Sequence, residues 1–161
     1  MTRIRRIVVE KSARWLRAFD ESGEIFLEAR VQLGFGAGDG PKCREGDGRT
    51  PEGKYRVCSK NPASKFFRAL GVSYPNAADA RAALDRGAIS AETCEALCRA
   101  ESEKIRPAWD TPLGGWIMLH GQHPDGPQVG DWTAGCIAVE NDVMERLFEC
   151  ADYGTAVEIY P

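Results

Sequence analysis

A strict alternation of side chains in residues 25–33 constrains the fold more than any other feature of this sequence. Because successive side chains of a strand point to opposite faces, a period of two predicts a β-strand with one buried face. Such a strand has to pair with others, so the chain is expected to form a sheet. The alternating residues are Ile25, Leu27, Ala29, Val31 and Leu33 on one face and Phe26, Glu28, Arg30 and Gln32 on the other.

Other β-rich runs lie before and after this strand, with turn residues between them. Residues 34–53 are rich in Gly and Pro and predict a long loop. Within that loop, Thr50-Pro51-Glu52-Gly53 has Pro and Gly where a type I turn favours them. The further strands expected are residues 4–9, 15–19, 55–58, 116–119, 137–139 and 156–160.

Helical signals interrupt the β pattern in the middle of the chain and return near its end. Asn76 followed by Asp79 predicts a capped helix that stops near Gly87. Ser90 predicts the start of a second helix, and Asn141 opens a third and serves as its cap. The second helix has an apolar stripe made of Cys94, Leu97, Cys98 and Ile105.

We therefore expect one domain over residues 1–161, mainly β with a partly helical insertion at 59–115 and a C-terminal helix, which is an α+β class. A chain of 161 residues with 43% apolar side chains buries enough surface to fold without metal or disulfides. The 21 basic against 24 acidic residues argue against a nucleic-acid partner. No apolar run approaches the roughly 20 residues that span a bilayer, and a monomer is assumed.

The N-terminus starts with a basic stretch, Thr2 to Arg6, like that of a secretory signal. The apolar run that follows, Ile7 to Val9, is far shorter than the roughly 7–15 residues of a signal core. The chain therefore works in the cytoplasm or has lost a leader, and these two alternatives stay open.

Six cysteines are an even number, but a chain of this length and core content is not expected to depend on a disulfide framework, and the pairing of the cysteines other than Cys136 stays open. Cys94 and Cys98 share a helix face, but the only histidines that could complete a metal site are His120 and His123. Packed core thiols are the better interpretation, and we expect neither a metal nor a cofactor.

Cys136 and His120 carry the strongest signal for chemistry. An ordinary thiol is only a few per cent ionised at neutral pH, so a nucleophilic Cys needs a basic neighbour, and imidazole lowers its pKa. Each residue ends or begins a predicted buried strand, so two adjacent strands could bring them together. Gly135 leaves the backbone open beside the thiol, and the amides of Gly135 and Cys136 could form an oxyanion hole. His123 is expected to be exposed and passive.

His120-Gly121 followed by Thr133-Ala134-Gly135-Cys136 resembles the signature of the L,D-transpeptidase catalytic domain (YkuD type). The turn Gly46 to Tyr55 and the Asn after the Cys also fit this family. The run Trp132 to Ala138 resembles a variant branch with a Trp-Thr-x-Gly-Cys-Ile-Ala motif, since Ala134 and Ala138 stand where many members have His and Arg.

The resemblance implies a β-sandwich or barrel and an enzyme that acts on peptidoglycan stem peptides without a cofactor. In that family Cys136 would attack the carbonyl at the L-centre of diaminopimelate, and His120 would move the proton. The carbonyl of Gly121 would orient the imidazole. The thioester is then resolved by an amine in transpeptidation or by water in hydrolysis.

Several residues are weaker candidates for substrate contact. Tyr74 and Trp132 could line the cleft, and Thr133 could bond the Cys loop or the substrate. Three basic loop residues could meet the anionic stem peptide: Lys42, Arg44 and Arg49.

Two alternatives to a transpeptidase remain open at this point. One is an L,D-carboxypeptidase or endopeptidase that hydrolyses peptidoglycan links, and the other is an envelope binding module whose dyad has decayed. If a leader was removed, the chain belongs in the periplasm or cell envelope. A papain-like enzyme is disfavoured, because there the Cys precedes the His in the chain, whereas His120 precedes Cys136.

Overall fold

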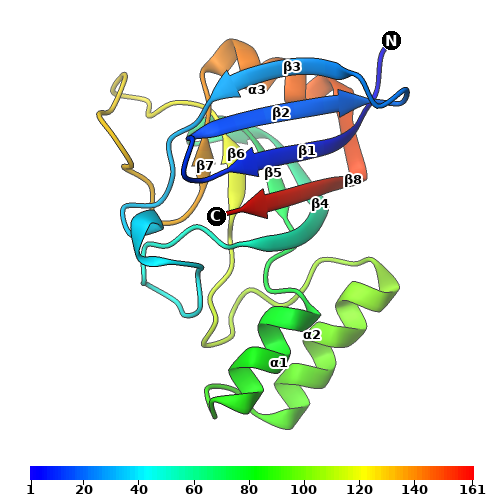
Figure 1. Ribbon diagram of the computed structural model, residues 1–161, viewed down its shortest axis with the longest axis vertical. Coiled ribbons are helices and arrows are strands. Elements are labelled where there is room, and N and C mark those ends of the chain that lie inside the picture. The colour runs from blue at the N-terminus through cyan, green and yellow to red at the C-terminus, as the bar shows by residue number, and fades with distance from the viewer.

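The computed structural model describes all residues 1–161 and contains one eight-stranded sheet with three α-helices (Figure 1). The strand order is β3-β2-β1-β8-β4-β5-β6-β7, so the two ends of the chain, β1 and β8, lie side by side in its middle. The strands are β1 (Ile4–Glu10), β2 (Trp15–Asp20), β3 (Ile25–Arg30), β4 (Gly53–Ser64), β5 (Phe67–Val72), β6 (Met118–His120), β7 (Ile137–Ala138) and β8 (Ala151–Tyr160).

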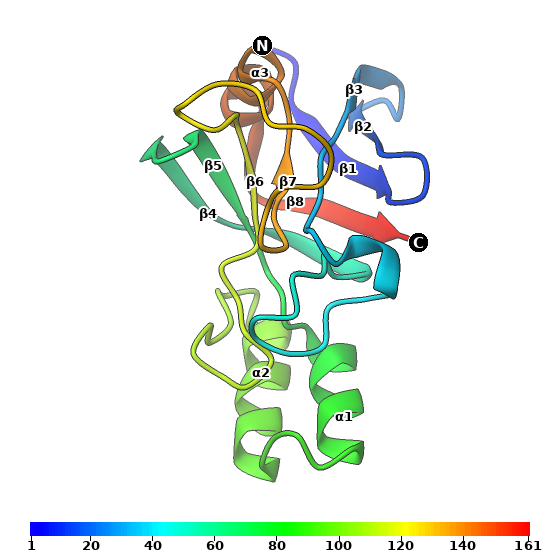
Figure 2. The ribbon, with the colours of Figure 1, turned by 90° about the vertical axis from the view of Figure 1, so that its left-hand side faces the viewer.

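The sheet is strongly curved, and its two edges are tied together (Figure 2). Just beyond β3, Gln32 forms an antiparallel bridge with Ala138 of β7 through two backbone hydrogen bonds of 3.0 and 2.8 Å. β1 pairs with β8, and β6 pairs with β7, in parallel, while the other neighbouring strands are antiparallel. The expected α+β class with a β-barrel-like sheet is confirmed.

The inside of the curved sheet holds one apolar core. The alternation at residues 27–33 buries Leu27, Ala29, Val31 and Leu33 as predicted, while Ile25 at the start of β3 stays exposed. Helix α3 (Asn141–Cys150) packs against β5, β6 and β8 and buries Met144 and Leu147. A short 3-10 turn, η1 (Ala37–Asp39), lies in the long loop after β3.

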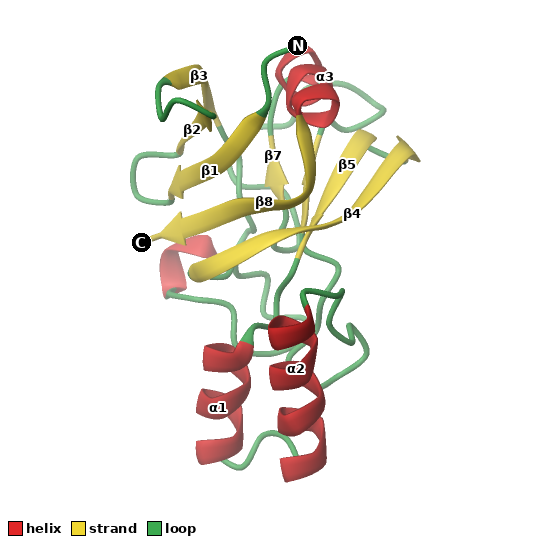
Figure 3. Ribbon diagram, turned by 90° about the vertical axis from the view of Figure 1, so that its right-hand side faces the viewer, coloured by secondary structure: helices red, strands yellow, loops and turns green.

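Helices α1 (Ala77–Asp85) and α2 (Ala91–Glu103) lie side by side at one end of the sheet (Figure 3). Asn76 caps α1 in a capping box with Asp79, and Ser90 caps α2, as the sequence predicted. The expected insertion at 59–115 is too wide, because half of β4 and all of β5 fall in that range and belong to the sheet. Ile105 lies beyond the end of α2 and is exposed, so it is not part of the helix stripe. None of the helices has the length and apolar character needed to cross a membrane.

Candidate active site

His120 ends β6, and its imidazole is buried with a defined orientation. Its Nδ1 lies 2.7 Å from the Gly121 carbonyl oxygen, so Nδ1 carries the proton and donates, which leaves Nε2 as the basic nitrogen. The Phe66 ring stacks on the imidazole at a centroid distance of 4.5 Å. Burial lowers the pKa of His120 below its ordinary value, and the bond to Gly121 opposes this only in part. The ring is therefore neutral near pH 7.

Gly121 has room for no side chain, which explains why the sequence has Gly after the His. A Cβ there would lie 2.4 Å from Asn141 Oδ1 and 2.9 Å from the Phe66 carbonyl oxygen. Asn141 Oδ1 accepts the N–H of Gln122 at 2.8 Å. The prediction that Asn141 caps the last helix is wrong: Glu140 occupies the cap position, and the Asn141 amide instead holds the turn that follows the histidine.

Cys136 directly precedes β7, which pairs with β6 as the sequence predicted. Its Sγ accepts the Met118 N–H and donates to the Trp116 carbonyl oxygen, both at 3.4 Å. Burial raises the pKa of the thiol to about 11, although the Met118 N–H and the Lys42 charge act in the opposite direction. The expected lowering of the Cys136 pKa is therefore wrong, because desolvation outweighs the charges near the thiol. The resting dyad is a thiol and a neutral imidazole.

Cys136 and His120 open into the same hollow, which we call the imidazole hollow. Its volume is about 300 Å³. Cys136 is half-buried and reaches this space, so the sulfur is not sealed inside hydrocarbon. The lining residues are Phe66, His120, His123, Trp132, Thr133, Ala134 and Cys136.

Thr133 holds the cysteine loop in place. Its hydroxyl donates to the Cys136 carbonyl oxygen at 2.7 Å and accepts the Gly135 N–H at 3.1 Å. The Gly135 amide is thus already bonded and is not a free oxyanion donor, contrary to expectation. The Cys136 N–H makes no hydrogen bond within the chain and remains available for an oxyanion.

Thr50, which the sequence analysis placed only in a turn, supports the same loop from the other side. Its fully buried hydroxyl donates to the Gly135 carbonyl oxygen at 2.9 Å and accepts the Gly34 N–H at 3.0 Å. Gly34 has to be Gly, because a Cβ there would lie 2.8 Å from the Gly135 Cα. The loop after β3 therefore lies directly beside the chain that enters β7 (Figure 2). The Thr-Pro-x-Gly pattern was the signal for this role.

Lys42 and Asp47 form an ion pair of 2.9 Å in which both side chains are buried. Asp47 also accepts the backbone N–H groups of Cys43, Arg44 and Arg49. Burial would raise the pKa of Asp47, but these N–H donors and the Lys42 ammonium bring it below its ordinary value. Lys42 is consequently part of the framework of the loop rather than a solvated surface lysine.

Some of the residues predicted to contact substrate line the imidazole hollow, and others do not. Trp132 lines the imidazole hollow, and its indole N–H donates to Gln32 Oε1 at 2.9 Å. Tyr74 is fully buried, and its hydroxyl donates to the Leu113 carbonyl oxygen at 2.8 Å, so the prediction that it lines the cleft is wrong. His123 also lines the hollow, which contradicts the expectation of a merely exposed side chain. Phe66, which sequence reasoning missed, covers the imidazole from the tip of the β4–β5 hairpin.

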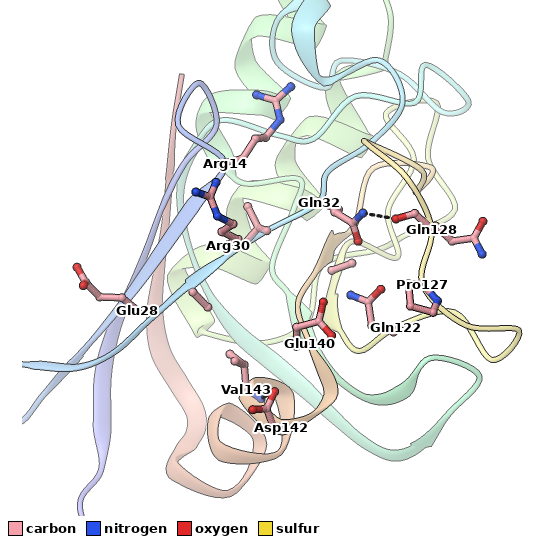
Figure 4. A pocket seen from close by; sticks show the side chains of 13 residues that line it. Arg14, Glu28, Arg30, Gln32, Gln122, Pro127, Gln128, Glu140, Asp142 and Val143 are labelled. Carbon is pink, nitrogen blue, oxygen red and sulfur yellow. Dashed lines mark hydrogen bonds between the residues drawn. The ribbon is translucent and has the colours of Figure 1, made fainter.

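A larger hollow of about 450 Å³ lies between β3 and the start of α3 (Figure 4). Gln32 stands at its edge and donates to the Gln128 carbonyl oxygen at 2.6 Å. Neither Cys136 nor His120 lines this space, so the smaller imidazole hollow is the candidate active site. All six cysteines are free thiols, and no group of three or more His, Cys, Asp or Glu side chains is placed to hold a metal.

A family model described as the L,D-transpeptidase catalytic domain (YkuD) matches residues 4–159. The chain belongs to this family. An L,D-transpeptidase candidate of Escherichia coli K12, YafK, is 34% identical over 147 residues, which are 89% of this chain and 45% of YafK. The chain thus spans about half the length of the curated relatives it matches.

Solved structures of L,D-transpeptidases and related proteins share the fold. A mutant of the helical cell shape determining protein Pgp2 from Campylobacter jejuni superposes with a TM-score of 0.67 at 25% identity, covering 97% of this chain and 46% of Pgp2. L,D-transpeptidase 1 of Mycobacterium tuberculosis has a TM-score of 0.55 at 13% identity, covering 99% of this chain and 62% of that protein. The second likeness concerns the fold alone.

Proposed function

We propose that this L,D-transpeptidase-family chain is a cysteine acyltransferase that acts on peptidoglycan stem peptides through a thioester. The observation that carries the proposal is the opening of the Cys136 thiol and the oriented His120 imidazole into one hollow. The Gly121 carbonyl fixes the tautomer with Nε2 free, which is the form a general base requires.

Sγ attacks the carbonyl carbon of the L-centre of diaminopimelate, and His120 Nε2 takes the thiol proton as the Sγ–C bond forms. The oxyanion accepts the Cys136 N–H. His120 then gives the proton to the leaving nitrogen, the C–N bond breaks, and D-alanine departs. An amine of another stem then attacks the thioester carbonyl and loses a proton to His120, the new C–N amide bond forms as the C–Sγ bond breaks, and His120 returns the proton to Sγ.

The neutral dyad determines how the thiol is activated. A thiol with a pKa of about 11 is almost wholly protonated near pH 7. The proton therefore leaves during the attack on the substrate carbonyl rather than before it, and a neutral His120 is ready to receive it. This route needs no positive charge at the position of Ala138.

Water in place of the amine would give a carboxypeptidase or endopeptidase by the same steps. Peptidoglycan lies outside the cytoplasmic membrane, so the working chain would act in the periplasm or cell envelope.

Trp132 and Thr133 lie beside the acyl site. Trp132 forms one wall of the imidazole hollow, and Thr133 supports the cysteine loop.

The test is incubation of the purified chain with tetrapeptide muropeptides, followed by mass spectrometry of the products. Cross-linked dimers with release of D-alanine support a transpeptidase, and tripeptides alone support a hydrolase. A carbapenem should leave a covalent adduct that Cys136→Ala abolishes. Cys58→Ala is the matched control, since burial also raises the pKa of Cys58 to about 11. If neither a carbapenem adduct nor a product forms, a binding module is favoured instead.

A further inference from the structure

A second hollow, of about 260 Å³, lies next to the cysteine loop and has no role in the mechanism above. It carries two large aromatic side chains that are mostly exposed, Phe35 at 66% and Trp116 at 62%. We call it the glycine-lined hollow, because four of its lining residues are Gly46, Gly48, Gly114 and Gly115.

Both aromatic rings are held in position although they face solvent. The Phe35 ring packs where a side chain on Gly48 would lie, 2.3 Å from the site of its Cβ. The Trp116 indole lies 4.6 Å from the Trp109 ring, and the Arg106 guanidinium contacts both indoles. Two fixed apolar surfaces beside bare backbone are suited to packing the aliphatic part of a peptide ligand.

Trp116 is also tied to the nucleophile. Its backbone carbonyl oxygen accepts a hydrogen bond from the Cys136 thiol at 3.4 Å, and its φ of +59° is a left-handed conformation that a tryptophan rarely adopts. Ala134 lines both this hollow and the imidazole hollow, so the two spaces meet at the cysteine loop.

The position of His120 decides which part of a donor each hollow can take. The imidazole has to reach the leaving nitrogen, so the leaving group lies on the His120 side of Sγ. Sγ contacts the backbone of the segment 116–120 at Trp116 and Met118, and His120 lies at the far end of that segment. With the leaving group at the His120 end, the acyl residue extends toward the Trp116 end, where the glycine-lined hollow lies.

The hollow contains one buried ammonium and one exposed carboxylate. Lys42 Nζ bonds Asp47 and the Arg44 carbonyl oxygen, which uses two of its three N–H donors. Glu45 forms no ion pair within the chain. One N–H of Lys42 and the Glu45 carboxylate can therefore serve a ligand that carries a carboxylate and an ammonium close together.

We infer that the glycine-lined hollow binds the side chain of the acyl residue, a zwitterionic amino-acid head on a short aliphatic stem. This rests on the proposed function, in which that residue is diaminopimelate. Its methylene groups pack between Phe35 and Trp116, its ammonium pairs with Glu45, and its carboxylate accepts the free N–H of Lys42. Glu45 and Trp116 are then specificity-determining residues.

The experiment compares D-alanine release from three tetrapeptide donors, which contain diaminopimelate, diaminopimelate acetylated at its side-chain amine, or L-lysine. The wild-type chain is expected to prefer the first. Glu45→Gln should lower kcat/KM for that donor about tenfold, mainly through KM, and should change the acetylated donor little, because a charge-assisted bond is lost only where the ammonium exists. Trp116→Ala should raise KM for all three donors, and Trp116→Phe should restore part of the loss.

Glu149→Gln, an exposed carboxylate on α3, is the matched control and should leave every donor unchanged. The alkylation rate of Cys136 by iodoacetamide should be the same in Glu45→Gln as in the wild type. Equal kcat/KM for all donors, or an equal effect of Glu45→Gln on the free and acetylated forms, would overturn the inference and leave the proposed function intact. Failure of the wild-type chain to release D-alanine from any donor would overturn the proposed function itself.

Discussion

The two hollows on either side of the cysteine loop are built in different ways. The imidazole hollow depends on regular structure: its base ends β6 and its nucleophile precedes β7, and these strands are paired. The glycine-lined hollow is formed from loops, which the buried Lys42–Asp47 pair holds. Because strand pairing sets positions more rigidly than loops do, we infer that the sheet fixes the chemistry while the loops decide what is bound.

The largest effect on activity should come from a substitution in the imidazole hollow. His120→Gln removes the base but keeps a polar side chain of similar size, so kcat/KM should fall about 10²–10⁴-fold. Thermal unfolding followed by circular dichroism should show a folded protein. If His120→Gln keeps wild-type turnover, the imidazole is not the base and the assignment of chemistry to this hollow is wrong.

In the glycine-lined hollow, the largest expected effect is on the stability of the fold, through the buried Lys42–Asp47 pair. Lys42→Met leaves the Asp47 carboxylate buried without its partner, so unfolding free energy should fall by about 3–5 kcal/mol in urea denaturation. Lys42→Met combined with Asp47→Asn should recover part of the loss, since no charge then remains buried and the Asn side-chain oxygen can still accept backbone N–H groups of the loop. Arg44→Met, at an exposed neighbouring position, is the control and should change stability little. A Lys42→Met chain as stable as the wild type would show that the pair does not hold the loops.

The smallest effect concerns the pH dependence of the dyad. His120 has its pKa lowered by burial, so it stays neutral to a lower pH than an ordinary imidazole. The acid limb of kcat/KM should therefore have an apparent pKa below 6.5, with activity lost as pH falls through it. The fold should also lose stability as pH falls from about 6.5 through the lowered pKa of His120, because over that range the unfolded chain binds the proton more readily. An acid limb centred above 6.5 would contradict a buried neutral base.

The raised pKa of the Cys136 thiol can be tested separately through its rate of alkylation. Iodoacetamide should alkylate Cys136 in the free enzyme more slowly than free cysteine at pH 7, and the rate should climb as pH approaches about 11. Mass spectrometry of peptides can follow Cys136 and Cys58 together, and similar slow rates are expected for both. Rapid alkylation confined to Cys136 near neutral pH would indicate a preformed thiolate instead.

Local patterns in the sequence were sufficient for much of the fold. Alternation at residues 27–33 and the caps at Asn76 and Ser90 depend on neighbours within a few positions, and the structure has each of them as predicted. The second half of β4 was placed in the insertion because its residues are polar and partly exposed, so nothing local distinguishes them from a loop, and β5 was placed there with it although Ala69 to Val72 are buried. The β4–β5 hairpin carries Phe66, so the residue that covers the imidazole was missed with it.

By itself, the sequence determined which side chains could do chemistry, since His-Gly and Thr-x-Gly-Cys next to short apolar runs imply two strand ends close together. Only the tertiary structure decided their ionisation, because the pKa of Cys136 depends on burial by residues distant in the chain. It also decided that Tyr74 lies in the core and that Asn141 and Thr50 hold the site's turns. Such roles come from contacts between segments far apart in sequence, and no local pattern records them.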